Sequence, residues 1–317
     1  MERGWLPLRI QPLFSEENGK MMQAKNKVYL SVGDVRMGLS SDFPLRLLEG
    51  TEAFRCEERP PDVSIDVIAA DVLPTVPGVP CGDDGIFRYY RDDQYYYEEA
   101  KLGKDGAISQ AIYPPDFSRV VLYVNEGAFP NVVRTVDKVL QLLPMRQLLA
   151  HYQAFLLHSS RIAVCGKAVL FTAPSQTGKT TQARLWNCYE HTEIAGNDRT
   201  ILRKSGNEFH TYGYPVDGSS PIYSNKRLPL GAIVVLRQGT ENHIQRLSVP
   251  QALKCLMGQT AMDTWNASER MAIQQLWLDL LEEYPVYLLT FRADKDAVVC
   301  LKQQLEKDEV IPFAHHS

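Results

Sequence analysis

The feature that most constrains the fold is segment 167–186, where three local patterns follow one another without a gap. Residues 167–171 (KAVLF) form a short apolar run typical of a strand buried in a sheet. A small polar loop, 173–180 (APSQTGKT), comes next, and a helical pattern begins at about Lys179. A strand that leads through a short loop into a helix is a unit of α/β folds, so this segment predicts an α/β core.

The loop matches the phosphate-binding pattern G-x-x-x-x-G-K-[ST] except at its first position, where Ala173 replaces glycine. Its backbone N–H groups and the following helix N-terminus favour an anion, Lys179 would reach the β- and γ-phosphates, and the Thr180 hydroxyl would bind Mg²⁺. The alternative is an ordinary polar turn. If position 173 needs a positive φ, alanine would weaken binding. The pattern predicts that ATP and Mg²⁺ are bound by residues of this loop, namely Ser175, Gln176, Thr177, Gly178, Lys179, Thr180 and Thr181.

An acidic residue lies downstream of the loop. Asp198, in the stretch 194–199 (IAGNDR), follows a short apolar run, which is the kind of place where a strand ends facing bound phosphates. Its carboxylate would hold Mg²⁺ or accept a proton from an attacking hydroxyl group. Taken alone, an Asp before an Arg is more typical of a turn.

The rest of the C-terminal half also reads as α/β. The apolar runs 230–236 and 285–291 predict two more buried strands. Helical spacing of apolar residues covers 132–143 and then, after Pro144, a second helix whose apolar stripe extends to Phe155. Three further helices are predicted over 250–257, 267–283 and 294–307.

The N-terminal half reads as β-rich. Strands are predicted at 28–32, 64–68, 86–90, 94–97 and 119–124, with a hairpin around 91–93 and prolines between the runs. These patterns predict a small antiparallel sheet with one solvated face. We therefore divide the chain into a β-rich N-terminal domain, 1–125, and a second domain, 126–317. Five tyrosines between 89 and 97 form either a recognition surface or ordinary cross-strand pairs.

Composition excludes several classes of protein. The 317 residues are 44% apolar with a net charge of -4, which is ordinary for a soluble protein and gives no case for nucleic-acid binding. No apolar run is long enough to span a membrane, and no secretion signal is recognised. The six scattered cysteines form no CxxC pair, which favours free thiols in the cytoplasm over a zinc site. The tail histidines, His315 and His316, are interpreted as a frayed end.

Five segments resemble, in order, the C-terminal catalytic domain of the HPr kinase/phosphorylase family. They are 157–164 (LHSSRIAV), the phosphate loop, 196–199 (GNDR), 212–220 (YGYPVDGSS) and 224–230 (SNKRLPL). The resemblance spans about 146–305. It implies a phosphoenolpyruvate carboxykinase-like P-loop core with a mixed sheet, and a homo-oligomer.

The resemblance also implies roles for particular residues. A His ahead of the loop lies near the phosphates in the family, and a pair of Asp residues binds the metal and activates an acceptor serine. If these roles apply at the matching positions of this chain, His158, Lys179 and Asp198 would be catalytic, and Thr180 and Asp198 would hold the metal. Here the pair reads Asn197-Asp198, so one carboxylate remains and dephosphorylating activity is not implied.

Alternatives stay open around these residues. His158 is alternatively a hydrogen-bonded core residue, and loop 213–220 is either a lid over the ligands or a connection. Arg227 is a candidate to neutralise transferring charge, and Asn225 is a weaker candidate.

These observations predict an ATP- and Mg²⁺-dependent kinase that phosphorylates a hydroxyl group, serine of a peptide or small protein in the first instance. Because the N-terminal half does not resemble the sensor domain of full HPr kinases, HPr itself is not the expected acceptor. Ala173 and Asn197 motivate a first alternative, a nucleotide-binding module without catalysis. A kinase for a small-molecule alcohol and a carboxykinase-type enzyme are the others.

Overall fold

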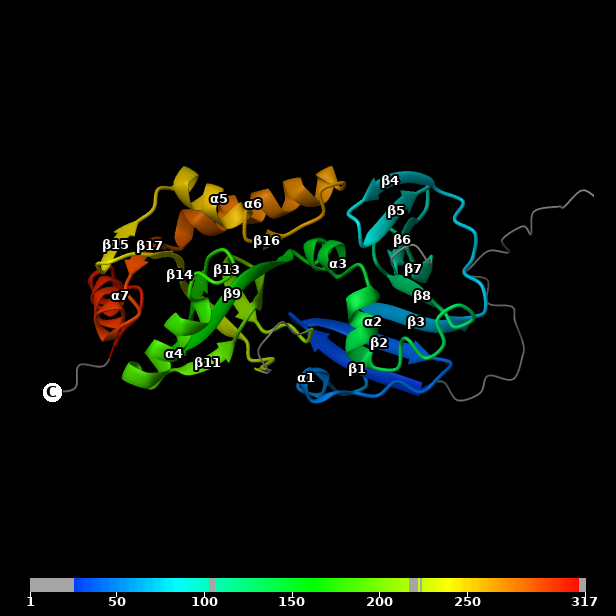
Figure 1. Cartoon of the computed structure of the whole chain (residues 1–317), viewed down its shortest axis with the longest axis horizontal. Helices are drawn as coiled ribbons and strands as arrows, with labels where there is room; N and C mark the ends of the chain where they lie inside the picture. Colours follow the sequence, from blue (N-terminus) through cyan, green and yellow to red (C-terminus); the bar gives the residue numbers. More distant parts are fainter. Residues whose placement is uncertain (1–25, 103–105, 217–221, 223, 314–317) are drawn as a thin grey trace, which may run out of the picture.

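The computed structural model describes residues 26–102, 106–216, 222 and 224–313, which form two mixed β-sheets and seven helices. The two sheets lie one after the other along the long axis of the molecule, with helix α3 between them (Figure 1). The predicted α/β class and the mixed sheet of the C-terminal half are confirmed.

The first sheet has eight strands in the order β1-β2-β3-β8-β7-β6-β5-β4. Its strands are β1 (Asn26–Val32), β2 (Val35–Ser41), β3 (Val63–Ala70), β4 (Val79–Asp83), β5 (Phe87–Arg91), β6 (Tyr96–Lys101), β7 (Ala107–Tyr113) and β8 (Arg119–Asn125). The prediction of an antiparallel sheet is wrong at two pairs, because β2–β3 and β3–β8 are parallel. The chain between β2 and β3 carries helix α1 (Glu49–Glu52) and crosses over, so β3 runs in the same direction as β2.

The predicted hairpin of the tyrosine-rich segment is confirmed as the antiparallel pair β5–β6, in which Tyr90 lies opposite Tyr97. Tyr96 stacks on Tyr113 of β7 with ring centroids 5.7 Å apart. Tyr89 and Tyr97 are buried. The tyrosines of the paired strands therefore pack across strands, as the simpler of the two interpretations expects.

The second sheet has nine strands. Two of them are long, and each pairs with different neighbouring strands along its length. Its strands are β9 (Ala154–Val164), β10 (Lys167–Thr172), β11 (Glu193–Gly196), β12 (Arg199–Ser205), β13 (Glu208–Tyr212), β14 (Leu228–Gln238), β15 (His243–Arg246), β16 (Thr260–Ala261) and β17 (Val286–Phe291). β10, β14 and β17 are mutually parallel neighbours. β9 pairs with β12 through 154–158 and with β10 through 159–164, both antiparallel.

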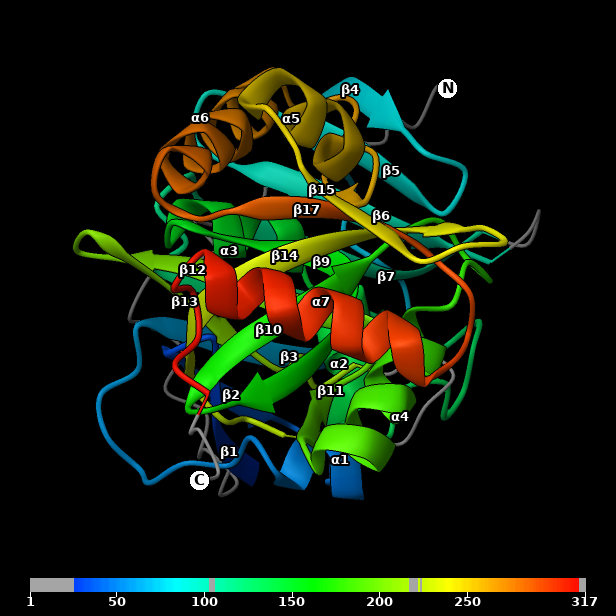
Figure 2. The same ribbon diagram turned by 90° about the vertical axis from the view of Figure 1, so that its left-hand side faces the viewer.

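Helices cover both faces of the parallel strands (Figure 2). Helices α5 (Val249–Met257) and α6 (Ala267–Glu283) pack against one set of strand side chains, which includes Leu170 and Ile233. Helices α4 (Lys179–Glu190) and α7 (Lys295–Lys307) pack against the alternate set, which includes Phe171 and Val234. Covering both faces explains why these strands are continuous apolar runs in sequence. Trp186 of α4 is fully buried.

The helix predictions hold best where a cap defines the start. Asn266 and Asp294 cap α6 and α7, their side chains accepting hydrogen bonds from Glu269 N and Ala297 N. The predicted helix at 132–143 is shorter, since α2 spans Val136–Leu142. The next helix, α3, spans Met145–His151, and Phe155 lies in β9 instead. Gln153, with φ 56°, turns the chain between them, so the helical spacing of Phe155 is coincidental.

One core cluster runs from the first sheet into the second. Leu30 and Ile65 of the first sheet pack in the same cluster as Leu148 of α3 and Leu156 and Ile201 of the second sheet. The division of the chain at residue 125 into separate domains stays a prediction. Within the described part of the chain, none of the helices has the length and apolar character needed to cross a membrane.

Candidate functional site

Three segments converge where β10 ends. Because β9 runs antiparallel to β10, Ser159 pairs with Thr172, and the Thr172 hydroxyl donates to the carbonyl oxygen of His158 at 2.9 Å. β11 and β12 follow one another along the other edge of β9, with Gly196 opposite Arg161 and Arg199 opposite His158. The break between β11 and β12 is the Asn197-Asp198 step. It therefore lies beside the start of loop 173–180.

The loop turns through two residues with positive φ, Gln176 (64°) and Gly178 (116°). Gly178 precedes the first residue of α4, and a Cβ atom added to it would lie 2.7 Å from Cζ of Phe291. Glycine is required there for both reasons. Ala173 is buried and does not have a positive φ. The departure from the pattern at position 173 therefore introduces no backbone strain.

Lys179 begins α4, as predicted, and its side chain folds back over the loop. Its ammonium group donates to the carbonyl oxygens of Ala173 at 2.8 Å and Pro174 at 3.2 Å. Burial lowers the pKa of Lys179. The amine is thus held at the inner face of the loop by two neutral carbonyl groups.

The structure brings Asn197, rather than Asp198, to the Thr180 hydroxyl. Thr180 donates to Oδ1 of Asn197 at 3.0 Å, and Ser160 donates to the same oxygen at 2.5 Å. Sequence reasoning treated Asn197 only as a lost carboxylate and did not select Ser160. The tandem acidic pair of the resembling family was the signal that pointed to position 197.

The position of Asn197 determines which oxygen ligands the protein could offer to Mg²⁺. The oxygens of Thr180 and Asn197 are hard neutral donors, which fit Mg²⁺ together with phosphate oxygens. In the described residues there is no group of three or more His, Cys, Asp or Glu side chains placed to hold a metal ion by themselves. The protein would therefore supply a partial ligand set.

His158 and Asp198 form a second polar pair beside the loop. His158 Nε2 lies 3.3 Å from Asp198 Oδ1, and the two side chains are 31% and 26% exposed. Burial lowers the pKa of His158, as does the nearby Lys179 cation, while Asp198 opposes the shift. The lowered pKa favours the neutral form of the His158 imidazole. Asp198 adopts φ 84°, a strained conformation for a residue with a side chain and one that recurs at functional sites.

The other predicted residues of the loop are placed around its outer side. Gln238 donates to the carbonyl oxygens of Gln176 at 3.4 Å and Thr177 at 3.3 Å. The Thr181 side chain is exposed on α4. Ser175 lines the pocket described below.

The two weaker candidates from segment 224–230 contact other groups. Asn225 donates to the carbonyl oxygen of Ser31 at 3.0 Å, and Arg227 lies 3.2 Å from His210 and 3.6 Å from Asp34. The contacts with Ser31 and Asp34 join segment 224–230 to the β1–β2 hairpin. Of the loop 213–220, residues 217–220 lie outside the described residues.

A buried arginine, Arg161, holds the segment that precedes Asp198 in place through hydrogen bonds. It is fully buried and donates to the carbonyl oxygens of Ala195 at 2.7 Å, Lys226 at 2.8 Å and Ser224 at 3.2 Å. Burial lowers its pKa to about 10, so it remains charged at neutral pH. Arg161 therefore ties β11 and segment 224–226 to β9, a role that the sequence did not reveal.

A pocket of about 810 Å³ opens beside these residues. His158, Ser175, Asp198 and Arg199 are among the residues that line it. Other lining residues come from the first sheet, α3 and the segment before β16, namely Phe87, Glu98, Arg146, Gln147 and Gln259. The volume is in the range of ligand pockets, about 300–1,000 Å³. The pocket thus joins the loop end of the second sheet to the first sheet.

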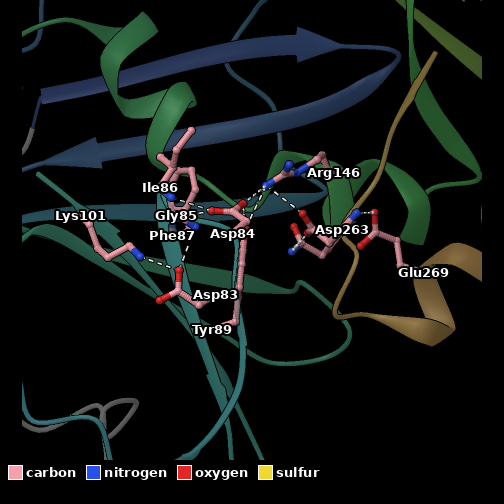
Figure 3. Close-up of polar contacts among 11 residues, drawn as sticks. Asp83, Asp84, Gly85, Ile86, Phe87, Tyr89, Lys101, Arg146, Asp263 and Glu269 are labelled. Carbon is pink, nitrogen blue, oxygen red and sulfur yellow. Dashed lines mark hydrogen bonds and ion pairs between the residues drawn. The ribbon is translucent and has the colours of Figure 1, made fainter. Parts of the chain in front are cut away.

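Charged groups from distant segments meet around Arg146, with Asp84, Asp263 and Glu269 nearby (Figure 3), and Arg146 and Glu98 line this pocket. We call Asp84, Glu98, Arg146, Asp263 and Glu269 the carboxylate cluster. Arg146 lies 2.8 Å from Asp263 and 3.6 Å from Asp84, and it donates to the Tyr89 hydroxyl at 3.0 Å. The backbone N–H of Asp263 donates to Glu269 at 3.2 Å. The Arg146 guanidinium group therefore pairs with two of the four carboxyl groups, those of Asp84 and Asp263.

The cluster predicts a pH-dependent stability. Burial, and then the charge of Asp263, raises the pKa of Glu269 to about 8 from 4.5. Between these values the folded protein binds more protons than the unfolded chain, so the free energy of unfolding falls as the pH rises. Replacing Glu269 with glutamine should flatten this slope by up to about 1.4 kcal/mol per pH unit.

Urea unfolding of both proteins between pH 5 and 8.5 measures this slope. The matched control is Glu282→Gln, since Glu282 is exposed on the same helix. A slope unchanged by Glu269→Gln, or changed equally by the control, would show that Glu269 ionises normally in the fold.

No curated protein matches the chain. Among solved structures, the HPr(Ser) kinase/phosphatase from Coxiella burnetii is similar with a TM-score of 0.30 and 10% sequence identity, over 49% of this chain and 98% of that chain. A family model described as SynChlorMet cassette protein ScmC matches residues 128–293. Because the match covers more than half of the chain, the protein belongs to the ScmC family.

Proposed function

We propose that the chain is an ATP- and Mg²⁺-dependent kinase that transfers the γ-phosphoryl group to an acceptor hydroxyl, serine of a peptide or small protein in the first instance. One observation carries the proposal. The His158–Asp198 pair, at 3.3 Å, and Ser175 of the loop line a ligand-sized pocket, and the Thr180–Asn197 contact, at 3.0 Å, involves the residue next to Asp198 in the chain.

The nucleotide would lie over the loop and the N-terminus of α4. Lys179 would exchange its two carbonyl partners, Ala173 and Pro174, for oxygens of the β- and γ-phosphates. Thr180 and Asn197 would hold Mg²⁺, which neutralises the charge of the β- and γ-phosphates when bound. The strand–loop–helix of β10 and α4 supports a P-loop core of the type shared by HPr kinases and phosphoenolpyruvate carboxykinase.

The acceptor would enter from the pocket. Its hydroxyl oxygen forms the new bond to the γ-phosphorus, the bond to the bridging oxygen of ADP breaks, and the hydroxyl proton passes to the Asp198 carboxylate. Neutral His158, at 3.3 Å, would orient that carboxylate. Positioning and electrostatic stabilisation supply most of the rate in such reactions.

One observation favours a second candidate, a nucleotide-binding module without catalysis. The residue on the Thr180 hydroxyl is the neutral Asn197, so the metal would have one fewer anionic ligand than in the resembling family. This candidate predicts Mg-ATP binding without transfer to any acceptor.

The cellular setting belongs to the proposal as well. All six cysteines are free thiols, which supports a reducing, cytoplasmic location where ATP is available.

Isothermal titration with Mg-ATP, Mg-ADP and Mg-GTP, followed by transfer assays with γ-labelled ATP and seryl peptides, tests the proposal. Saturable Mg-ATP binding followed by phosphoserine formation is the expected result. An absence of heat with all three nucleotides would overturn the kinase and the binding module together.

Replacing Asn197 with aspartate should lower the concentration of Mg²⁺ that ATP binding requires. A carboxylate beside the Thr180 hydroxyl adds an anionic metal ligand. We expect half-maximal ATP binding at about tenfold lower Mg²⁺ concentration, which corresponds to about 1.4 kcal/mol. Titrating Mg²⁺ at fixed ATP measures the effect.

The control for this substitution is Asn207→Asp, since Asn207 is exposed in the turn between β12 and β13. It adds the same charge away from the loop. An equal shift in both variants would assign the effect to net charge and remove Asn197 from the metal site.

A further inference from the structure

The residues that line the pocket include a buried glutamate with a carboxyl oxygen that lacks a partner. Glu98, on β6, is 2% exposed, lines the pocket, and its Oε2 atom accepts no hydrogen bond from the described residues. Buried carboxylates are rarely left without a cation or a donor because desolvation is costly. The only cation of the carboxylate cluster, Arg146, is already in contact with Asp263 and Asp84.

A second acceptor in the same pocket also lacks a donor. Gln147, on α3, is 6% exposed, and its Oε1 atom is buried with no partner among the described residues. Its orientation is determined because its Nε2 group donates to Asp263. The carbonyl oxygen is thus left over as an acceptor. Glu98 and Gln147 therefore both line one pocket, and each has a buried acceptor atom without a donor among the described residues.

The chemistry of these acceptors selects the ligand. A primary ammonium group carries a positive charge and three N–H donors, which complements a carboxylate and an amide oxygen. A metal ion fits less well, since the described residues contain no group of three or more His, Cys, Asp or Glu side chains placed to hold one. Phe87 also lines the pocket, and aromatic faces attract cations.

We infer that Glu98 and Gln147 form a binding site for a primary ammonium group of the acceptor, whose hydroxyl lies at Asp198, another residue that lines the same pocket. The inference rests on the proposed function for the hydroxyl end. The pocket volume of about 810 Å³ leaves room for a peptide segment between the two groups. The acceptor class is therefore a seryl peptide with a free amine, from its N-terminus or from a lysine side chain.

The titration of Glu98 agrees with this site. Burial raises the pKa of its carboxyl well above the ordinary value, and Asp263 raises it further, while Arg146 opposes the shift. The charged and titratable groups around it are Asp84, Tyr89, Tyr113, Arg146, Asp263 and Glu269. An ammonium group beside Glu98 favours its ionised form, so binding should release protons.

The test uses the full chain, immobilised, and a degenerate library of seryl heptapeptides in three forms. One form has free amines, one is acetylated at the N-terminus, and one is acetylated at lysine side chains as well. Retained peptides are quantified by mass spectrometry. We expect at least tenfold enrichment of free-amine peptides, and the N-terminally acetylated form distinguishes an α-amine from a lysine as the source.

Glu98→Gln should abolish the enrichment while leaving Mg-ATP binding unchanged. The control is Glu99→Gln, the next residue on β6, which accepts a hydrogen bond from Tyr90 and does not line the pocket. If Glu98→Gln does not fold, Gln147→Met removes the second acceptor and should lower the enrichment. Proton release, measured by calorimetry of a retained peptide in buffers of different ionisation enthalpy, should disappear in Glu98→Gln.

Each outcome bears on one proposal. No retained peptide, equal retention of free and acetylated forms, or enrichment that survives Glu98→Gln would overturn the ammonium site. Enrichment that depends on Glu98 in a protein that does not bind Mg-ATP would retain the ammonium site and reject the kinase.

Discussion

Replacing Lys179 with alanine is expected to abolish the stabilisation of the fold by Mg-ATP and to reduce phosphoryl transfer at least about 10²-fold. Lys179 is the cation of the loop and is positioned at its inner face by the carbonyl oxygens of Ala173 and Pro174. A ligand at about 100 times its dissociation constant adds about 2.7 kcal/mol to the stability of a protein, which raises the melting temperature by a few degrees. Only the wild type should show this shift.

Thermal unfolding with and without Mg-ATP measures the first effect, and γ-labelled ATP measures the second. The control is Lys254→Ala, because Lys254 is exposed on α5. The unliganded melting temperature of Lys179→Ala must be recorded too, since the substitution removes two hydrogen bonds within the loop. Wild-type turnover by Lys179→Ala would reject the phosphate-loop assignment.

Replacing Asp198 with asparagine is expected to lower the rate of transfer by about 10²–10⁴-fold while Mg-ATP binding is retained. Asparagine has the shape of aspartate and tolerates a positive φ, so the backbone at 84° should be preserved. What is lost is the carboxylate that would accept the hydroxyl proton. Initial rates at saturating Mg-ATP, together with calorimetric titration of Mg-ATP, separate the two effects.

A matched control exists in the first sheet. Asp34 also has a positive φ, 59°, in the turn between β1 and β2, so Asp34→Asn makes the same chemical change in a similar backbone conformation. It should leave the rate of transfer within about twofold of wild type. If Asp198→Asn transfers phosphate at the wild-type rate, Asp198 has no part in the chemistry, and His158 is the next candidate base.

Local patterns in the sequence predicted the elements whose determinants lie within a few residues. The apolar run 167–171 became β10, and α4 begins at Lys179 after Gly178, whose φ of 116° only glycine adopts freely. Helix α6 matches its predicted range because Asn266 caps it and apolar residues recur along one face. Caps, turns and periodicity act between near neighbours, so they can be recognised in a sequence.

The pairing of strands that are far apart in the chain could not be predicted from local patterns. The parallel pairs β2–β3 and β3–β8 depend on how the chain crosses over, and the amino acids of the strands do not encode this locally. Phe155 illustrates a different error. Its helical spacing after Pro144 led to its prediction as part of a helix, although it lies in β9.

For the candidate site, the sequence by itself determined the loop and singled out His158 and Asp198 as neighbours of it. Only the tertiary structure decided that Asn197 contacts Thr180, and that Glu98, Arg146 and Asp263 meet beside one pocket. The physical reason is that these contacts join strands and helices far apart in the chain. Their geometry follows from strand register and packing, and neither is visible in any local stretch of residues.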